Sequence, residues 1–213
     1  EFADSRNQDN YYARGTFTRE NLDFSSDVLH LADEGFEQIS VEPVVAAKGT
    51  GYDIREEDLP ILFKEYEKLA FEYVQRRKAS KGFNFFHFMI DLEGGPCVAK
   101  RLRGCGSGTE YMAVTPEGDL YPCHQFVGQK EFMLGNIFEG LNENPVRQDF
   151  METNVYTKPQ CHACWAKFYC SGGCAANAHQ FNKSIKIPYA IGCELEKKRV
   201  ECALWIKTQE IED

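Results

Sequence analysis

Cysteine is the residue whose number and spacing could do chemistry in this 213-residue chain. Four of its nine cysteines lie in the fourteen-residue stretch CHACWAKFYCSGGC, from Cys161 to Cys174, with the spacing C-x2-C-x5-C-x3-C. The others lie on either side, at Cys97, Cys105, Cys123, Cys193 and Cys202. Thiolates are soft metal ligands, and a C-x2-C step lets two sulfurs reach one metal centre. Since we expect no secretory leader, this grouping predicts metal binding rather than disulfides.

The type of metal centre follows in part from the thiol pattern. All cysteines except Cys202 are placed to supply two sites of four ligands, and Cys202 is expected to be a buried thiol on the last helix. Tetrahedral zinc and a cubane iron–sulfur cluster both take four thiolates. Zinc ribbons usually carry two C-x2-C steps about 15–20 residues apart, whereas this chain has one such step, in a run more similar to those of ferredoxins. We therefore favour iron–sulfur clusters, and a zinc-stabilised binding module is the alternative.

Composition and charge argue against several classes of partner. Hydrophobic residues make up 43% of the chain, and its formal net charge is −9. An acidic protein is repelled by the phosphates of nucleic acids and by anionic membranes. No apolar run approaches the roughly 20 residues that span a bilayer. We expect a cytoplasmic protein that binds neither nucleic acid nor membrane.

The segment before the cysteines alternates between strands and helices. Strands are predicted at 11–17 and 38–45, and helices at 25–35 and 59–74. This order is typical of parallel strands covered by helices, as in α/β barrels. Two such units cannot cover both faces of a parallel sheet. We therefore expect residues 1–80 to be a C-terminal piece of a larger α/β structure, and a small complete α/β domain is the alternative.

From residue 81 onward the elements shorten, and glycine and cysteine become frequent. We expect residues 81–213 to form an irregular α+β domain of cysteine-rich loops. Its expected elements are an aromatic segment of ambiguous type at 83–92, a hairpin that pairs 110–114 with 119–122, and a final helix at 191–211. The hairpin would return Cys123 toward Cys105.

The complete cysteine pattern resembles that of a known domain. The series C-x12-G-x4-C, C-x2-C-x5-C-x3-C and a final cysteine is similar to the seven-cysteine motif of the SPASM domain. That domain is a C-terminal extension of radical S-adenosylmethionine (SAM) enzymes that modify peptides and proteins. Over residues 10–206 the chain also resembles the SCIFF maturases, in the stretches RGTFTREN, ISVEPVV, GFNFFHFMIDL, GDLYPCHQFVG and YCSGGCAANA. Those enzymes form thioether crosslinks in six-cysteine ranthipeptide precursors.

The resemblance implies two auxiliary [4Fe-4S] clusters. The outer cluster, auxiliary cluster II, would be held by Cys161, Cys164, Cys170 and Cys193. The inner one, auxiliary cluster I, would be held by Cys105, Cys123 and Cys174, with Cys97 as the candidate fourth ligand. In SCIFF maturases one iron of the inner cluster is thought to stay open, so that a substrate thiol can bind there.

The resemblance also makes the two predicted strands the last of a partial (β/α)6 barrel. Barrel strands present ligands at their C-terminal ends, and Arg14 and Glu42 are the candidates to line a pocket for SAM and peptide. The implied activity is the formation of Cys-to-Thr thioether crosslinks in a ribosomal peptide. The implied partners are a cysteine-rich precursor peptide, an N-terminal radical SAM half and a reductant protein.

One motif of these enzymes is missing from the chain. A C-x3-C-x2-C loop holds the [4Fe-4S] cluster that cleaves SAM, but here Cys170 and Cys174 are followed by Asn177 where the third cysteine would stand. We expect the polypeptide alone to generate no radical, with SAM and the third cluster bound by an N-terminal half. The other alternative is a stand-alone iron–sulfur electron-transfer protein, for which the strand–helix region would be superfluous.

Overall fold

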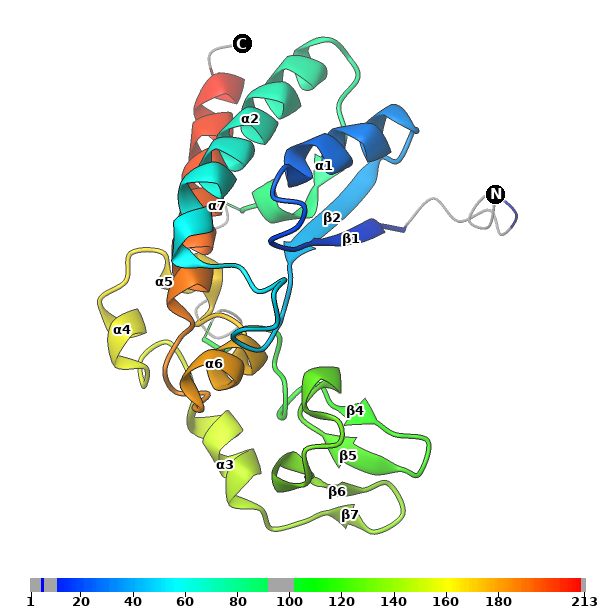
Figure 1. Ribbon diagram of the computed structural model, residues 1–213, viewed down its shortest axis with the longest axis vertical. Coiled ribbons are helices and arrows are strands. Elements are labelled where there is room, and N and C mark those ends of the chain that lie inside the picture. The colour runs from blue at the N-terminus through cyan, green and yellow to red at the C-terminus, as the bar shows by residue number, and fades with distance from the viewer. Residues whose placement is uncertain (1–4, 6–10, 92–101, 212–213) are drawn as a thin grey trace. The chain divides into compact units, whose positions relative to one another are not determined.

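The computed structural model describes residue 5 and residues 11–91 and 102–211. These residues form two compact units (Figure 1). The first unit holds residues 11–91 and 194–211, and the second holds residues 102–193. The long helix α7 (Ala190–Ile211) begins in the second unit and continues through the first.

A parallel sheet organises the first unit. In the described residues its strands have the order β1 (Ala13–Phe17), β2 (Gln38–Pro43) and β3 (Asn84–Phe85). Helix α1 (Phe24–Asp33) connects β1 to β2, and helix α2 (Leu59–Lys78), preceded by the short 3-10 turn η2 (Glu56–Asp58), follows β2. Both strand pairs are parallel, with Arg14 opposite Ser40 in the register. The predicted alternation of parallel strands and helices is therefore confirmed, with element ends shifted by a few residues.

The two faces of this sheet differ in polarity. Phe17 of β1 stacks on Phe24 of α1 with ring centroids 4.5 Å apart, and Phe24 lies 4.7 Å from the ring of Tyr66 in α2. All three side chains are fully buried. Because successive strand residues point to opposite faces, Arg14 and Thr16 lie on the other face, away from this aromatic cluster. The helices thus cover the apolar face, and the other face carries polar residues such as Arg14 and Thr16.

Helix α2 carries a long apolar stripe and contacts α7. Pro60 stands in its first turn, where a proline costs no hydrogen bond. Its buried residues recur at helical spacing: Leu59, Leu62, Tyr66, Leu69, Ala70, Tyr73 and Val74. From α7, Arg199 Nε donates to the Tyr66 hydroxyl at 2.9 Å, and Lys198 pairs with Glu67 at 2.6 Å. No helix in the described part of the chain is long and apolar enough to cross a membrane.

The structure divides the chain differently from the boundary expected near residue 80. The aromatic segment 83–92 begins as β3, which pairs with β2, and continues as the 3-10 turn η3 (Phe86–Phe88). Phe83 and Phe88 bury their rings against Tyr73, at 5.4 and 5.8 Å. The final helix was expected in the cysteine-rich domain, yet from residue 194 it belongs to the first unit. Both differences arise because burial against α2 decides where these segments pack.

The second unit contains a small antiparallel sheet. Its described strands, in order, are β4 (Ala113–Val114), β5 (Asp119–Tyr121), β6 (Gly135–Asn136) and β7 (Gly140–Leu141). The predicted hairpin is present in shorter form, with Val114 opposite Leu120. Gly118 in its turn has a φ of 91°, a conformation that favours glycine.

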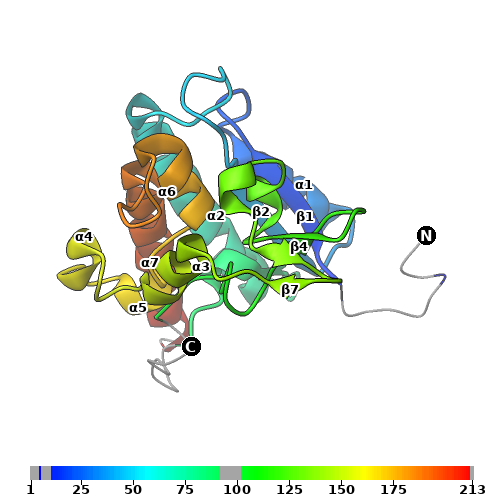
Figure 2. The same ribbon diagram turned by 90° about the horizontal axis from the view of Figure 1, so that it is seen from below.

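Short helices accompany the sheet of the second unit, and Figure 2 shows the chain running from β7 into α3. They are η5 (His124–Phe126), η6 (Lys130–Phe132), α3 (Pro145–Glu152), α4 (Pro159–His162), α5 (Lys167–Cys170) and α6 (Ala175–Asn182). Phe126, Phe132 and Phe150 form a buried aromatic core among them. Asn144 caps α3 by accepting the Val146 N–H at 2.8 Å. Because such helices are too short to be stable alone, this core decides their positions.

Candidate metal centre

Cys105 and Cys123 are distant in sequence but close in the second unit. Cys123 follows β5 by two residues, and the hairpin of β5 with β4 reverses the chain. Gly108, in the loop after Cys105, donates its N–H to the carbonyl oxygen of Pro122 at 3.0 Å. This bond joins the Cys105 loop to the residue before Cys123. The hairpin therefore returns Cys123 toward Cys105, as the spacing predicts.

Cys174 joins this pair from the segment before α6. A Cβ on Gly104 would lie 3.2 Å from the carbonyl oxygen of Gly173, so the two loops touch. Burial raises the pKa of the Cys174 thiol, the first N–H groups of α6 oppose this, and Cys105 raises it further. Burial likewise raises the pKa of Cys123, and Cys174 and Cys105 add to the effect. We call these three residues the inner group.

A second set of thiols lies near Lys158 and the end of α4. Its members are Cys161, Cys170 and Cys193, which lie near Lys158, and Cys164, which lies near Cys161; we call these four the outer group. The backbone of α4 brings the first two together, since Cys164 N donates to Cys161 O at 3.1 Å. Burial raises the pKa of the Cys161 thiol, Lys158 opposes this, and Cys164 raises it further. Cys161, Cys170 and Cys193 all act on the charge of Lys158, as does Cys174 of the inner group.

Lys158 is the residue at this site that sequence reasoning missed. The residue is 3% exposed, and its Nζ donates to the carbonyl oxygen of Gly172 at 2.8 Å. Burial lowers the pKa of Lys158, and the surrounding thiols oppose that shift. Lysine is almost never fully buried without a partner, so its position here is unusual. The available signal was a lysine directly before Pro159 and three residues before Cys161.

The thiols lie in two groups, but neither group has the geometry of a complete metal site within the described residues. Within the described residues, no three His, Cys, Asp or Glu side chains are close enough to hold one metal ion. The sequence candidate Cys97 lies outside the described residues. Cys202 lies apart in the first unit, 5% exposed, and burial raises its pKa to about 12, which agrees with a core thiol. Soft donors, burial and a buried cation fit an anionic thiolate-bound metal centre.

Arg14 and Glu42, the pocket candidates, meet on the polar face of the sheet. Arg14 Nη2 donates to Glu42 Oε1, and Ser40 Oγ donates to the same oxygen at 3.4 Å. The Arg14 and Glu42 side chains are 67% and 41% exposed. Glu42 lies near the C-terminal end of β2, whereas Arg14 is the second residue of β1. Their role in binding SAM stays a prediction.

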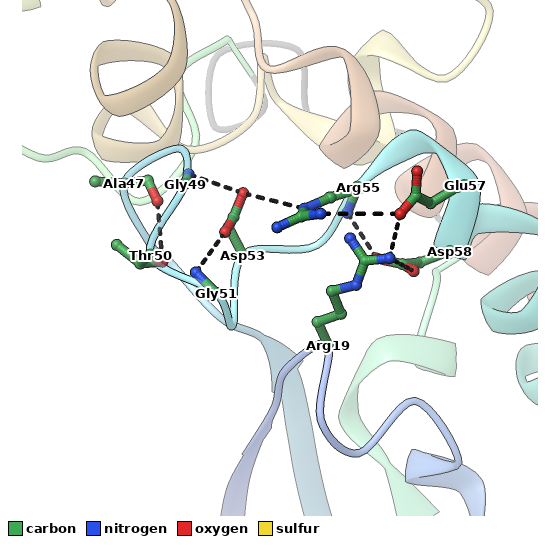
Figure 3. Close-up of polar contacts among 9 residues, drawn as sticks. All are labelled: Arg19, Ala47, Gly49, Thr50, Gly51, Asp53, Arg55, Glu57 and Asp58. Atoms are coloured by element: carbon green, nitrogen blue, oxygen red, sulfur yellow. Dashed lines mark hydrogen bonds and ion pairs between the residues drawn. The ribbon is translucent and has the colours of Figure 1, made fainter.

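A polar cluster lies where β1 and β2 end (Figure 3). Asp53 is 3% exposed and accepts the N–H of Gly49 at 3.1 Å and that of Gly51 at 3.0 Å. Both glycines have positive φ values, 86° and 93°, which disfavour other residues. The Gly49 N–H holds the pKa of Asp53 below its usual value, against the effect of burial. These two hydrogen bonds to Asp53 therefore fix the backbone conformation of the loop after β2.

Arg19 connects the end of β1 to the far side of this loop (Figure 3). Its Nη2 pairs with Glu57 and lies 3.4 Å from Asp58, which also accepts the Arg55 N–H at 2.9 Å. Its Nη1 is buried and finds no hydrogen-bond partner within the described residues. The cluster contains three carboxylates, those of Asp53, Glu57 and Asp58, and two arginines, Arg19 and Arg55. Because the carboxylates outnumber the arginines, the cluster fixes the conformation of the loop and does not form an anion-binding site. Sequence reasoning missed Arg19 because its partner Glu57 is 38 residues away.

Replacing Asp53 with alanine is expected to destabilise the first unit by about 1–3 kcal/mol, because two backbone N–H groups lose their acceptor. The pKa of Asp53 is lowered by folding. Its contribution is therefore present above the usual Asp pKa of about 3.9 and is lost as the pH falls through the lowered value. Urea unfolding at pH 7 and at low pH would measure this. The exposed Glu20→Ala variant is the control and should change stability by less than about 0.5 kcal/mol; equal effects would contradict the assignment.

One protein family and one characterised protein are similar to parts of this chain. Residues 105–165 match the SPASM family, described as an iron-sulfur cluster-binding domain. The match contains both cysteines of the hairpin region, Cys105 and Cys123, and the first two of the outer group, Cys161 and Cys164. A stretch of 130 residues is 28% identical to the antilisterial bacteriocin subtilosin biosynthesis protein AlbA of Bacillus subtilis (strain 168). It covers 55% of this chain and 24% of that protein.

Solved structures share the fold. The structure of a polyhistidine-tagged anSMEcpe with bound AdoMet matches 98% of this chain and 56% of that chain, with a TM-score of 0.70 and 16% identity. Native anSMEcpe with bound AdoMet and Cp18Cys peptide matches 100% of this chain and 60% of that chain, with a TM-score of 0.69 and 17% identity. At such identities the likeness concerns the mixed α/β fold alone. The chain spans about a quarter of the curated relative and little more than half of the solved chains.

Proposed function

We propose that the second unit binds two [4Fe-4S] clusters and that the chain is the C-terminal part of a radical SAM maturase that modifies a ribosomal peptide. The observation that carries this proposal is the nearness of Cys105, Cys123 and Cys174 to one another, and of Cys161, Cys170 and Cys193 to Lys158, in a chain whose residues 105–165 match an iron-sulfur cluster-binding domain. The relatives support it: one is a bacteriocin biosynthesis protein, and the other binds AdoMet and a peptide.

The two groups divide the cluster ligands. The outer group, Cys161, Cys164, Cys170 and Cys193, would supply the four thiolates of auxiliary cluster II. The inner group, Cys105, Cys123 and Cys174, would supply three thiolates of auxiliary cluster I, with Cys97 as the fourth ligand. The alternative for the last position is an open iron that receives the cysteine thiol of the substrate. The cluster, when bound, would lower the pKa of that thiol and accept an electron as the thioether forms.

The backbone near Cys174 favours a metal-bound thiolate. Burial acts against it at Cys123 and Cys161, whose thiol pKa values are raised, so metal binding must displace a proton from each of these thiols. The N–H groups at the start of α6 face Cys174 and favour its thiolate. The segment 171–173 joins the two groups through residues of positive φ. The backbone there can approach a cluster closely, because a left-handed turn brings its N–H groups to one side.

The first unit would complete a catalytic barrel. We propose that β1 and β2 are the last two strands of a six-stranded partial barrel, whose other strands come from an N-terminal radical SAM half. That half would hold SAM and the third [4Fe-4S] cluster, since C-x3-C-x2-C does not occur in these 213 residues. Arg14 and Glu42 would then face the pocket for SAM and peptide. A cysteine-rich precursor peptide, crosslinked from Cys to Thr, and a cytoplasmic reductant protein are the proposed partners.

Anaerobic reconstitution of the chain with ferrous iron and sulfide tests the cluster proposal. The expected result is broad absorbance at roughly 400 nm with about eight iron and eight sulfide per chain, the content of two cubanes. Incubation with SAM and dithionite should then yield no 5′-deoxyadenosine from this chain alone. Tight binding of zinc, with no uptake of sulfide, would instead support a zinc-stabilised binding module. Formation of 5′-deoxyadenosine would contradict the proposed division between two halves.

A further inference from the structure

The buried ammonium of Lys158 has no anionic partner among the described carboxylates. The residue is 3% exposed, and its hydrogen bond goes to a neutral acceptor, the carbonyl oxygen of Gly172, at 2.8 Å. No carboxylate in the described part of the chain forms an ion pair with it. A buried charge is costly unless it is paired. The fold therefore keeps a cation where carboxylates do not neutralise it.

The groups that would favour the charge of Lys158 are the thiolates of nearby cysteines. Cys161, Cys170 and Cys193 of the outer group lie within electrostatic range, and Cys174 acts on it as well. A cubane held by four thiolates carries a net negative charge, and its own sulfides add to the electron density. Such a group at the outer site would supply the anion that the buried ammonium lacks. The charge of the cation and that of the proposed cluster are thus complementary.

The hydrogen bond of Lys158 also fixes a loop that serves both groups. Gly172 lies between Cys170 of the outer group and Cys174 of the inner group. Its φ of 87° is left-handed, and a Cβ there would lie 3.8 Å from Lys158 Nζ, so the backbone passes directly over the ammonium. Because the bond reaches from the residues before Cys161 to this loop, Lys158 connects the two halves of the cysteine run.

We propose that Lys158 is a positioning residue for the cluster of the outer group: its fixed positive charge makes that cluster easier to reduce, and its bond to Gly172 holds the ligand loop. This inference rests on the proposed function. One electron passes from an external reductant to the cluster, and Lys158 neither gains nor loses a proton. At an effective dielectric of about 20, a unit charge within about 12 Å changes the ratio of reduced to oxidised cluster about tenfold.

The test uses the reconstituted 213-residue chain and its Lys158→Met variant, in which the aliphatic stem is kept and the charge removed. Each protein is titrated with dithionite under anaerobic conditions and followed by electron paramagnetic resonance, so that no enzymatic activity enters the measurement. We expect one of the two clusters to reduce at a more negative potential in the variant. At the wild-type midpoint of that cluster, its ratio of reduced to oxidised form should fall about tenfold.

Lys167→Met is the matched control. Lys167 lies between Cys164 and Cys170, and its Nζ donates to the carbonyl oxygen of His162 at 2.7 Å in an exposed position. The same substitution there removes a charge that water screens, so the potentials should stay near those of the wild type. Equal shifts in both variants, or none in Lys158→Met with its iron retained, would overturn the proposal.

If Lys158→Met loses iron, the Lys158→Arg variant, which keeps the positive charge, distinguishes a need for a cation from a need for packing. Recovery of iron in the arginine variant supports the need for a cation at this position. Loss in both variants assigns Lys158 a packing role alone and overturns the proposal. If the wild-type chain takes up no iron and sulfide, the proposed function itself fails. If it is fully loaded and Lys158→Met is unchanged, only the inference on Lys158 fails.

Discussion

Removal of one thiol from either group should cost the reconstituted chain about half of its iron. Cys164 of the outer group is partly buried, and Cys105 of the inner group is exposed, so alanine at either position leaves the core intact. Because each thiolate would serve one cluster, iron should fall from about eight to about four atoms per chain in each single variant. The double variant should bind almost none. Iron and sulfide analysis after anaerobic desalting would measure these contents.

The matched control is Cys202→Ala. Cys202 is buried in the first unit, whereas the cysteines of both groups belong to the second unit. Its variant should keep full iron, even if it loses some stability. The division into two clusters would be refuted if Cys164→Ala and Cys105→Ala each lost all iron, because the thiols would then share one site.

Replacing Phe24 with alanine should destabilise the first unit by about 3–5 kcal/mol, the range for large aromatic deletions in cores. The Phe24 ring is fully buried between Phe17 of β1 and Tyr66 of α2. Its removal opens a cavity between the sheet and both helices, which the rigid surroundings fill only in part. Urea unfolding followed by far-ultraviolet circular dichroism would give the change in the free energy of unfolding.

Phe71→Ala is the control for this prediction. Phe71 lies on α2 and is 53% exposed. The same deletion at that position leaves no cavity, so it should change the free energy of unfolding by less than about 0.5 kcal/mol. Similar losses in both variants would mean that the packing of Phe24 contributes no more than helix propensity does.

Prediction from the sequence succeeded where the signal was local. The apolar period of α2 and the glycine turn of the β4–β5 hairpin are each carried by residues within a few turns of one another. Such patterns depend on backbone geometry alone. The segment 83–92 gave no such pattern, since an aromatic run suits a strand and a buried helix equally. It became β3 only because β2 offers a partner and Tyr73 a buried surface.

The amino-acid order alone specifies two strand–helix units followed by cysteines, which are soft metal ligands, at characteristic spacing. The residues that accompany these cysteines are known only from the folded chain. Lysine side chains usually lie at the surface. Lys158 is buried because the loop that carries Gly172 packs against it. Arg199 is buried because its partner Tyr66 lies 133 residues away. Burial and pairing depend on neighbours brought together by folding, and for that reason no local pattern reveals them.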